Sequence, residues 1–145
     1  MVSERTVLLD TGPWVAFLNR RDQYHAWATA QFAQFRPPLL TCEAVVSETC
    51  FLVRTLRGGA EAVLAFLERE VVQIPLRLQG EHTAVKVLLA RYADVPMSLA
   101  DACLVRMSEQ YTNSLVLTCD SDFRRYRRHR RQRIPTIMPG EREQE

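Results

Sequence analysis

Short runs of β-branched and apolar residues alternate along this chain with longer stretches of helical periodicity. The strand-like runs fall at residues 5–9, 39–40, 71–74, 115–119 and 134–138. Strands that alternate with helices in this way are typical of a parallel sheet whose faces are covered by helices. The pattern therefore predicts an α/β fold with a parallel sheet of about five strands flanked by helices.

The predicted helices begin where a capping residue or a proline precedes a periodic apolar stretch. A short helix is expected after Gly12-Pro13, and longer helices are expected at about residues 22–35, 41–56, 60–69, 78–92 and 98–107. Asp22, Thr41 and Ser98 are the expected capping residues, and Gly58-Gly59 is the expected stop of the helix before it. The arginine-rich segment 124–133 is predicted to be a helical turn.

The size and composition of the chain indicate an ordinary single domain. A length of 145 residues leaves no room for a second domain, so residues 1–139 are predicted to form one domain and residues 140–145 a flexible tail. No apolar run approaches the roughly 18 residues of a membrane helix, and no signal peptide is recognisable, so a cytoplasmic location is expected. The four cysteines contain no C-x-x-C pair and are expected to be small buried residues: Cys42, Cys50, Cys103 and Cys119.

Four carboxylates interrupt otherwise apolar segments: Asp10, Glu48, Asp101 and Asp120. Asp10 and Asp120 each end a predicted strand, and the carboxyl edge of a parallel sheet is where ligands bind. Simpler explanations remain open, because Asp10 can cap a helix and Asp101 follows Ser98 with the spacing of a capping box. Glu48 is expected on the stripe of its helix that faces the core, or else at the margin of that stripe, in solvent.

Convergence of these acids on one pocket would explain all of them together. Carboxylates a few ångströms apart repel one another unless a cation neutralises them. Oxygen ligands without His or Cys favour Mg²⁺ or Mn²⁺, and the chemistry usually attached to such a site is phosphodiester hydrolysis.

The segment 124–133 contains seven arginines and no acid, whereas the rest of the chain is net acidic. Guanidinium groups suit bidentate contacts with phosphate, so the segment is expected to bind nucleic acid, a solvated face being the alternative. The expected RNA-binding residues are Arg124, Arg125, Arg127, Arg128, Arg130 and Arg131.

Four segments together resemble the acidic motifs of the PIN-domain family, which includes the VapC-type toxin ribonucleases. They are Leu8-Leu9-Asp10-Thr11, the stretch Thr41 to Val45 to Glu48, Met97-Ser98-Leu99-Ala100-Asp101-Ala102, and Leu117-Thr118-Cys119-Asp120-Ser121-Asp122-Phe123. They occur in the order and at the spacing of that family, over essentially the whole chain. Gly12-Pro13 departs from the Ser or Asn that commonly follows the first acid of the family.

The resemblance implies a metal-dependent endoribonuclease with a Rossmann-like sheet, in which Asp10, Glu48, Asp101 and Asp120 are the catalytic, metal-binding acids. It implies that Asp122 assists in binding Mg²⁺ or Mn²⁺, and that Thr11 and Thr118 are polar residues behind the ligands. It also implies a substrate that is mainly RNA, a homodimer and, for a toxin, a cognate antitoxin; a DNA substrate and a housekeeping nuclease stay open as alternatives. Apart from the resemblance, the large apolar side chains of segments 22–35, 60–69 and 78–92 indicate an interface, because a thin domain does not readily bury them all; packing inside one monomer is the alternative.

Parts of the sequence are compatible with three other interpretations. Asp10-Thr11-Gly12 is also the fingerprint of an aspartic protease, but such proteases are nearly all β. A phospho-accepting receiver domain requires an acidic pair near its start and a lysine near its end, and Lys86 is wrongly placed. The serious alternative is a catalytically silent PIN-like module that binds RNA or a protein without cutting.

Overall fold

A computed structural model describes residues 5–140 of the chain. The predicted tail therefore lies almost wholly outside the described residues. The main sheet has five parallel strands in the order β3-β2-β1-β4-β7. These strands are β1 (Thr6–Leu9), β2 (Leu39–Leu40), β3 (Val72–Gln73), β4 (Ser114–Leu117) and β7 (Thr136–Ile137). The predicted α/β class and the five-stranded parallel sheet are confirmed.

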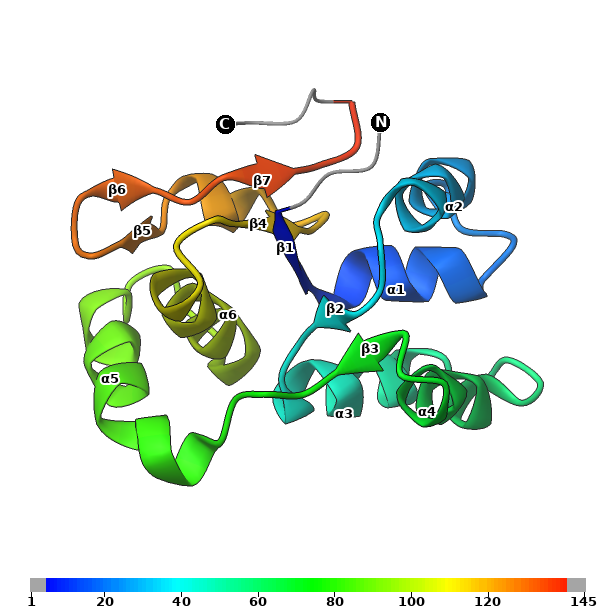
Figure 1. Cartoon of the computed structure of the whole chain (residues 1–145), viewed down its shortest axis with the longest axis horizontal. Coiled ribbons are helices and arrows are strands. Elements are labelled where there is room, and N and C mark those ends of the chain that lie inside the picture. The colour runs from blue at the N-terminus through cyan, green and yellow to red at the C-terminus, as the bar shows by residue number, and fades with distance from the viewer. Residues whose placement is uncertain (1–4, 141–145) are drawn as a thin grey trace.

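Six α-helices flank this sheet in the described part of the chain. They are α1 (Thr11–Leu18), α2 (His25–Gln34), α3 (Glu43–Leu52), α4 (Gly59–Glu68), α5 (Leu78–Arg91) and α6 (Leu99–Gln110). In Figure 1, α5 and α6 lie to one side of the central strands, and α1 and α2 lie to the other. None of these helices, within residues 5–140, combines the length and hydropathy needed to cross a bilayer.

The core is built around the two central strands. β1 pairs with β4 over its whole length, from Thr6 opposite Ser114 to Leu9 opposite Leu117. Leu8 and Leu9 are completely buried, and α6 is buried over most of its circumference, as its apolar sequence predicts. Because both strands end at the same level, the residues that follow them meet at one edge of the sheet.

Several helix ends differ from the sequence predictions for local reasons. Thr41 does not cap α3, because its hydroxyl donates to the Leu9 carbonyl at 2.7 Å and ties β2 to β1. The actual cap position, Cys42, makes no side-chain capping bond. Gly58 and Gly59 open α4 and do not simply stop the helix before it, since Gly58 takes a left-handed backbone at the α4 cap.

The arginine-rich segment was predicted wrongly as a single helical turn. A short 3₁₀ helix (Ser121–Arg124) ends at the first arginine of the segment, and a β-hairpin of β5 (Arg127–Arg128) and β6 (Gln132–Arg133) follows. The turn of the hairpin places His129 and Arg130 at positive φ. Glu109 accepts the His129 N–H at 2.7 Å, so contacts with α6, invisible in the sequence, hold the hairpin.

The aromatic residues expected to leave an apolar surface are mostly packed. Phe35 is buried, and Trp27, Phe32 and Phe66 are partly buried against the core. The exposed large apolar side chains are Tyr24, Phe51, Leu52, Leu64, Leu78, Val87 and Leu99. The predicted cysteine roles hold in part, because Cys42 and Cys103 are buried whereas Cys50 and Cys119 are partly exposed.

Candidate functional site

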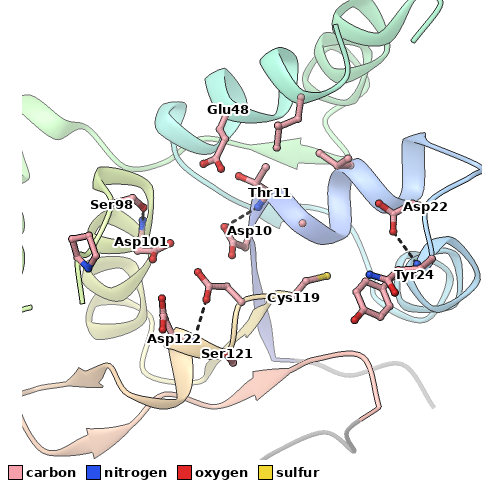
Figure 2. A pocket seen from close by; sticks show the side chains of 16 residues that line it. Asp10, Thr11, Asp22, Tyr24, Glu48, Ser98, Asp101, Cys119, Ser121 and Asp122 are labelled. Atoms are coloured by element: carbon pink, nitrogen blue, oxygen red, sulfur yellow. Dashed lines mark hydrogen bonds between the residues drawn. The ribbon is translucent and has the colours of Figure 1, made fainter. Parts of the chain in front are cut away.

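A cavity of about 690 Å³ lies where β1 and β4 end, and α1, α3 and α6 also contribute to its walls. Figure 2 shows this cavity with its lining side chains. The structure brings all five predicted acids to this one cavity and adds a sixth, Asp22. The predicted five are Asp10, Glu48, Asp101, Asp120 and Asp122.

Asp10 is fixed at the centre of this edge by the sheet itself. Its N–H donates to the Leu117 carbonyl, so the residue extends the pairing of β1 with β4. One carboxylate oxygen accepts the Thr11 N–H at 2.8 Å, and the other accepts the Thr118 hydroxyl at 2.6 Å. The same side chain therefore caps α1 and lines the cavity, so the capping explanation and the site are compatible.

The surroundings of Asp10 destabilise its charged form. Burial raises its pKa, hydrogen bonds from Thr118 and Thr11 lower it, and the charges of Asp101 and Asp120 raise it, so that the resulting pKa is about 7. The ionised form of Asp10 at neutral pH is therefore electrostatically unfavourable unless a bound cation neutralises its charge.

Asp101 is held at the first turn of α6 by two side chains. The Ser98 Oγ accepts the Asp101 N–H at 3.0 Å, as the capping-box spacing predicts. The Tyr126 hydroxyl donates to the Asp101 carboxylate at 2.7 Å. Burial and the charges of Asp120 and Glu48 raise the pKa of Asp101, and the Tyr126 hydrogen bond lowers it, so that the resulting pKa is about 6.

Thr118 connects two of the acids. Its hydroxyl donates to Asp10 and accepts the N–H of Asp120 at 2.9 Å. An Asp120 carboxylate oxygen in turn accepts the Asp122 N–H at 2.8 Å, and the Asp122 carboxylate faces Arg125 at 3.8 Å. The end of β4 thus fixes the distance between the first and the last of the four acidic motifs.

Glu48 does not lie on the core-facing stripe of its helix. It is exposed, and Val45 and Thr49 point inward from α3 in its place. Its carboxylate extends from α3 toward Asp10 in Figure 2, on the opposite side of the cavity from Asp122. The alternative that Glu48 lies at the margin of the core-facing stripe, in solvent, is therefore correct, and at this margin the side chain lines the cavity.

The contributors to the site that the sequence did not predict include Tyr126 and Gly12 besides Asp22. Tyr126 is completely buried within the arginine-rich segment, where an isolated aromatic residue was the available signal. Gly12 lies so close to Cys119 that a Cβ at this position would meet the Cys119 Cβ at 2.9 Å. A glycine after the first acid therefore lets α1 begin directly against the end of β4. The Thr11 hydroxyl is buried and has no hydrogen-bond partner among residues 5–140.

The chemistry of the donors fits a hard divalent cation. The cavity offers six carboxylates, and no basic side chain is found among its described lining residues. Cys119 is the one sulfur donor there, but burial and the charges of Asp10 and Asp22 raise its pKa to about 12, so the thiol stays protonated. In the described residues no three acid, His or Cys side chains already surround a common point, so the exposed Glu48 and the half-buried acids would have to rotate inward around an ion.

The predicted RNA-binding arginines divide into two groups. Arg127 and Arg128 are half-buried and donate to backbone carbonyls of residues 108, 124 and 126. The remaining four are exposed at or beside the β5–β6 hairpin: Arg124, Arg125, Arg130 and Arg131. Arg133, which was not among the predicted contacts, is also exposed and lines a small cavity of about 110 Å³ together with Arg124.

Comparison with known families matches the PIN domain model to residues 7–129, a range that contains all five predicted acids. The chain belongs to the PIN domain family. The resemblance expected from the four acidic motifs is thereby confirmed. Among solved structures, this PIN domain is similar to VapC20 of Mycobacterium tuberculosis, described as a toxin that cleaves the sarcin-ricin loop. The two share 26% identity with a TM-score of 0.70, over 81% of this chain and 92% of that one. No curated protein matches this chain.

Proposed function

We propose that this PIN domain is an endoribonuclease that depends on Mg²⁺ or Mn²⁺ and hydrolyses phosphodiester bonds at the acidic cavity. The observation that carries the proposal is a cavity of six carboxylates with no basic side chain among the described residues that line it. A phosphate of RNA is repelled from such a cavity unless a cation binds there. A divalent ion bound to these carboxylates would activate water and neutralise charge on the phosphoryl oxygens.

The side chains of the cavity divide the work of holding that ion. Asp10 and Asp101 are the fixed ligands, because Thr118 and Tyr126 hydroxyls bind one oxygen of each. Glu48, Asp120 and Asp122 are the mobile ligands, because they are exposed or half-buried. Thr118 acts as a positioning residue, since its hydroxyl sets the place of Asp10 relative to Asp120.

RNA is the proposed substrate, because VapC20 is described as cleaving the sarcin-ricin loop and because the arginine-rich β5–β6 hairpin begins five residues after the cavity residue Asp122. The exposed arginines supply the positive charge that the cavity lacks. Arg124 and Arg133 line a small recess where guanidinium groups could bind one phosphate. For single strands the slope of log affinity against log salt falls by about 0.7 for each phosphate contact. Replacing Arg130, Arg131 and Arg133 by Gln should therefore flatten the slope by about 2, whereas unchanged salt dependence would exclude the hairpin from binding.

The nuclease proposal is tested by incubating structured and single-stranded RNA with the protein and Mg²⁺ or Mn²⁺. We expect cleavage that stops with EDTA and is abolished by Asp10→Asn and by Asp101→Asn, both checked for folding by circular dichroism. The matched control is Asp94→Asn, an exposed acid outside the cavity. RNA binding without cleavage by the unmodified protein would instead indicate a catalytically silent module.

A role as the toxin of a toxin-antitoxin pair, with a cognate antitoxin, extends the proposal and rests on the similarity to VapC20. Growth arrest on expression, relieved by co-expression of a small neighbouring gene, is the expected result. A homodimer is also proposed, because Leu64 on α4 and Leu78 and Val87 on α5 expose apolar side chains on two of the helices expected to form the interface. Light scattering at micromolar concentration tests it, since a mass of 16.7 kDa would show a monomer. A cytoplasmic location stays a prediction.

A further inference from the structure

We infer that the end of the cavity at Tyr24 is a subsite for one unpaired RNA base next to the cleaved phosphate. This inference rests on the proposed function and identifies which part of the substrate the cavity recognises. In Figure 2, Tyr24 lies well to one side of Asp10, and Asp101 and Asp122 lie to the other side. The cavity therefore has an end with metal-ligating acids and a second end with a different chemistry.

The second end of the cavity carries an aromatic ring. Tyr24 is 36% exposed and lines the cavity together with Gln23, its neighbour in the chain. An aromatic ring offers a stacking face that accepts any base, and single-strand-binding proteins use such rings in this way. The Gln23 amide supplies a donor and an acceptor for the edge of a base.

Tyr24 is held in place before any ligand binds. The Asp22 carboxylate accepts the Tyr24 N–H at 2.8 Å, and the Asp22 carbonyl accepts the N–H of His25. The ring of His25 is hydrogen-bonded to the Ala16 carbonyl at 2.8 Å, which ties the start of α2 to α1. The Trp27 ring meets the Tyr24 ring edge to face at 6.4 Å. A fixed aromatic surface loses little conformational freedom when it stacks on a base.

The charges around Tyr24 favour a base over a phosphate. Asp22 lines the same end of the cavity, and its charge contributes to the raised pKa of the Cys119 thiol, so the two side chains lie near each other. A phosphate placed there would be repelled by Asp22, whereas the N–H groups of a base can donate to that carboxylate. The phosphate is therefore expected at the Asp10 end, near the metal ligands, and the adjoining base at the Tyr24 end.

Exposure alone does not mark such a site, as Phe51 shows. Phe51 is 59% exposed, but it lies outside the cavity, and the guanidinium of Arg54 lies 3.9 Å from the centre of its ring. Phe51 therefore provides a matched control, because it is an exposed aromatic residue that does not line the cavity.

The experiment measures cleavage of an RNA that the unmodified protein cuts, using Tyr24→Ala, Tyr24→Phe and Phe51→Ala. Tyr24→Ala should raise KM about tenfold with a smaller change in kcat, because stacking on one base is lost. Tyr24→Phe and Phe51→Ala should cleave like the unmodified protein. Thermal unfolding checks that all variants are folded.

A second arm places an abasic nucleotide on either side of the cleaved bond. At one of the two positions the abasic RNA should raise KM for the unmodified protein about as much as Tyr24→Ala does. The same RNA should cause no further loss in Tyr24→Ala, because the ring and the base are one interaction. Equal effects of the abasic site on both proteins, or an unchanged KM for Tyr24→Ala, would overturn the inference.

The two proposals fail in different ways. If Tyr24→Ala cleaves RNA like the unmodified protein, the base-subsite inference is wrong, whereas the proposed nuclease function stands. If no RNA is cut with either metal, the proposed function fails, and binding of a fluorescent single-stranded RNA of mixed sequence in Mg²⁺ decides the subsite. Weaker binding by Tyr24→Ala than by Phe51→Ala supports it, and equal binding or no binding overturns it.

Discussion

The metal-free protein should lose stability as the pH rises from 5 to 8, through Asp10. The pKa of this carboxyl is raised from an ordinary value of 3.8 to about 7, chiefly by burial, with Asp101 and Asp120 as the charged neighbours. Between these two values the folded protein binds a proton that the unfolded chain has released. The stability that this proton provides is complete below about pH 4 and is lost as the pH passes 7.

The magnitude follows from the two pKa values. The linkage relation gives a loss of about 2.5 kcal/mol in the free energy of unfolding between pH 5 and pH 8 for Asp10 alone. An unfolding entropy of roughly 2.1 cal/mol/K per residue over 145 residues converts this loss into a fall in Tm of about 8 °C. Asp101, whose pKa is raised to about 6, shifts stability in the same direction.

The assay is thermal unfolding in EDTA across this pH range, for the unmodified protein and for Asp10→Asn. The asparagine keeps an acceptor for the Thr11 N–H but carries no charge, so its Tm should vary less with pH and should exceed that of the unmodified protein at pH 8. Adding Mg²⁺ at pH 8 should raise the Tm of the unmodified protein more than that of Asp10→Asn. The exposed Asp94→Asn is the control and should behave like the unmodified protein.

Two results would refute this reasoning. A Tm that is constant or rises from pH 5 to pH 8 would mean that Asp10 is charged without strain in the folded protein. An unchanged pH dependence in Asp10→Asn would mean that another group is responsible.

Two further predictions concern single packing contacts. Tyr126→Phe removes the hydroxyl that donates to Asp101. We expect cleavage kinetics at least tenfold slower and, in urea titration, a loss of about 1–3 kcal/mol in unfolding free energy. Full activity of this variant would show that Asp101 does not need the Tyr126 hydrogen bond. Gly59→Ala would press a Cβ against the Val53 carbonyl oxygen, so a loss of about 3 kcal/mol or more in unfolding free energy is expected from urea titration. Gly80→Ala, in α5 with open space around the position, should be neutral or stabilising in the same titration.

The sequence by itself was enough to predict the order of the helices and strands and the family of the chain. Strand and helix periods are local properties of the chain, so the parallel sheet was predictable, and the ends of strands at Asp10 and Asp120 marked the ligand-binding edge. Acids in apolar company were conspicuous for the same local reason. The capping bond of Ser98 to the N–H of Asp101 was also predictable, because it spans one turn of helix.

Contacts between residues distant in sequence were decided only by the tertiary structure. The Tyr126 hydroxyl meets Asp101 because the chain after β4 returns over α6, and the hairpin forms because α6 binds its turn through Glu109. Glu48 is exposed because it faces the cavity. Helical periodicity could not predict this exposure, because a space between elements leaves no signature in the period of one helix. Local sequence fixes which face of an element is apolar, but the pKa of Asp10, the partner of Asp101 and the place of Tyr24 depend on what packing brings near them.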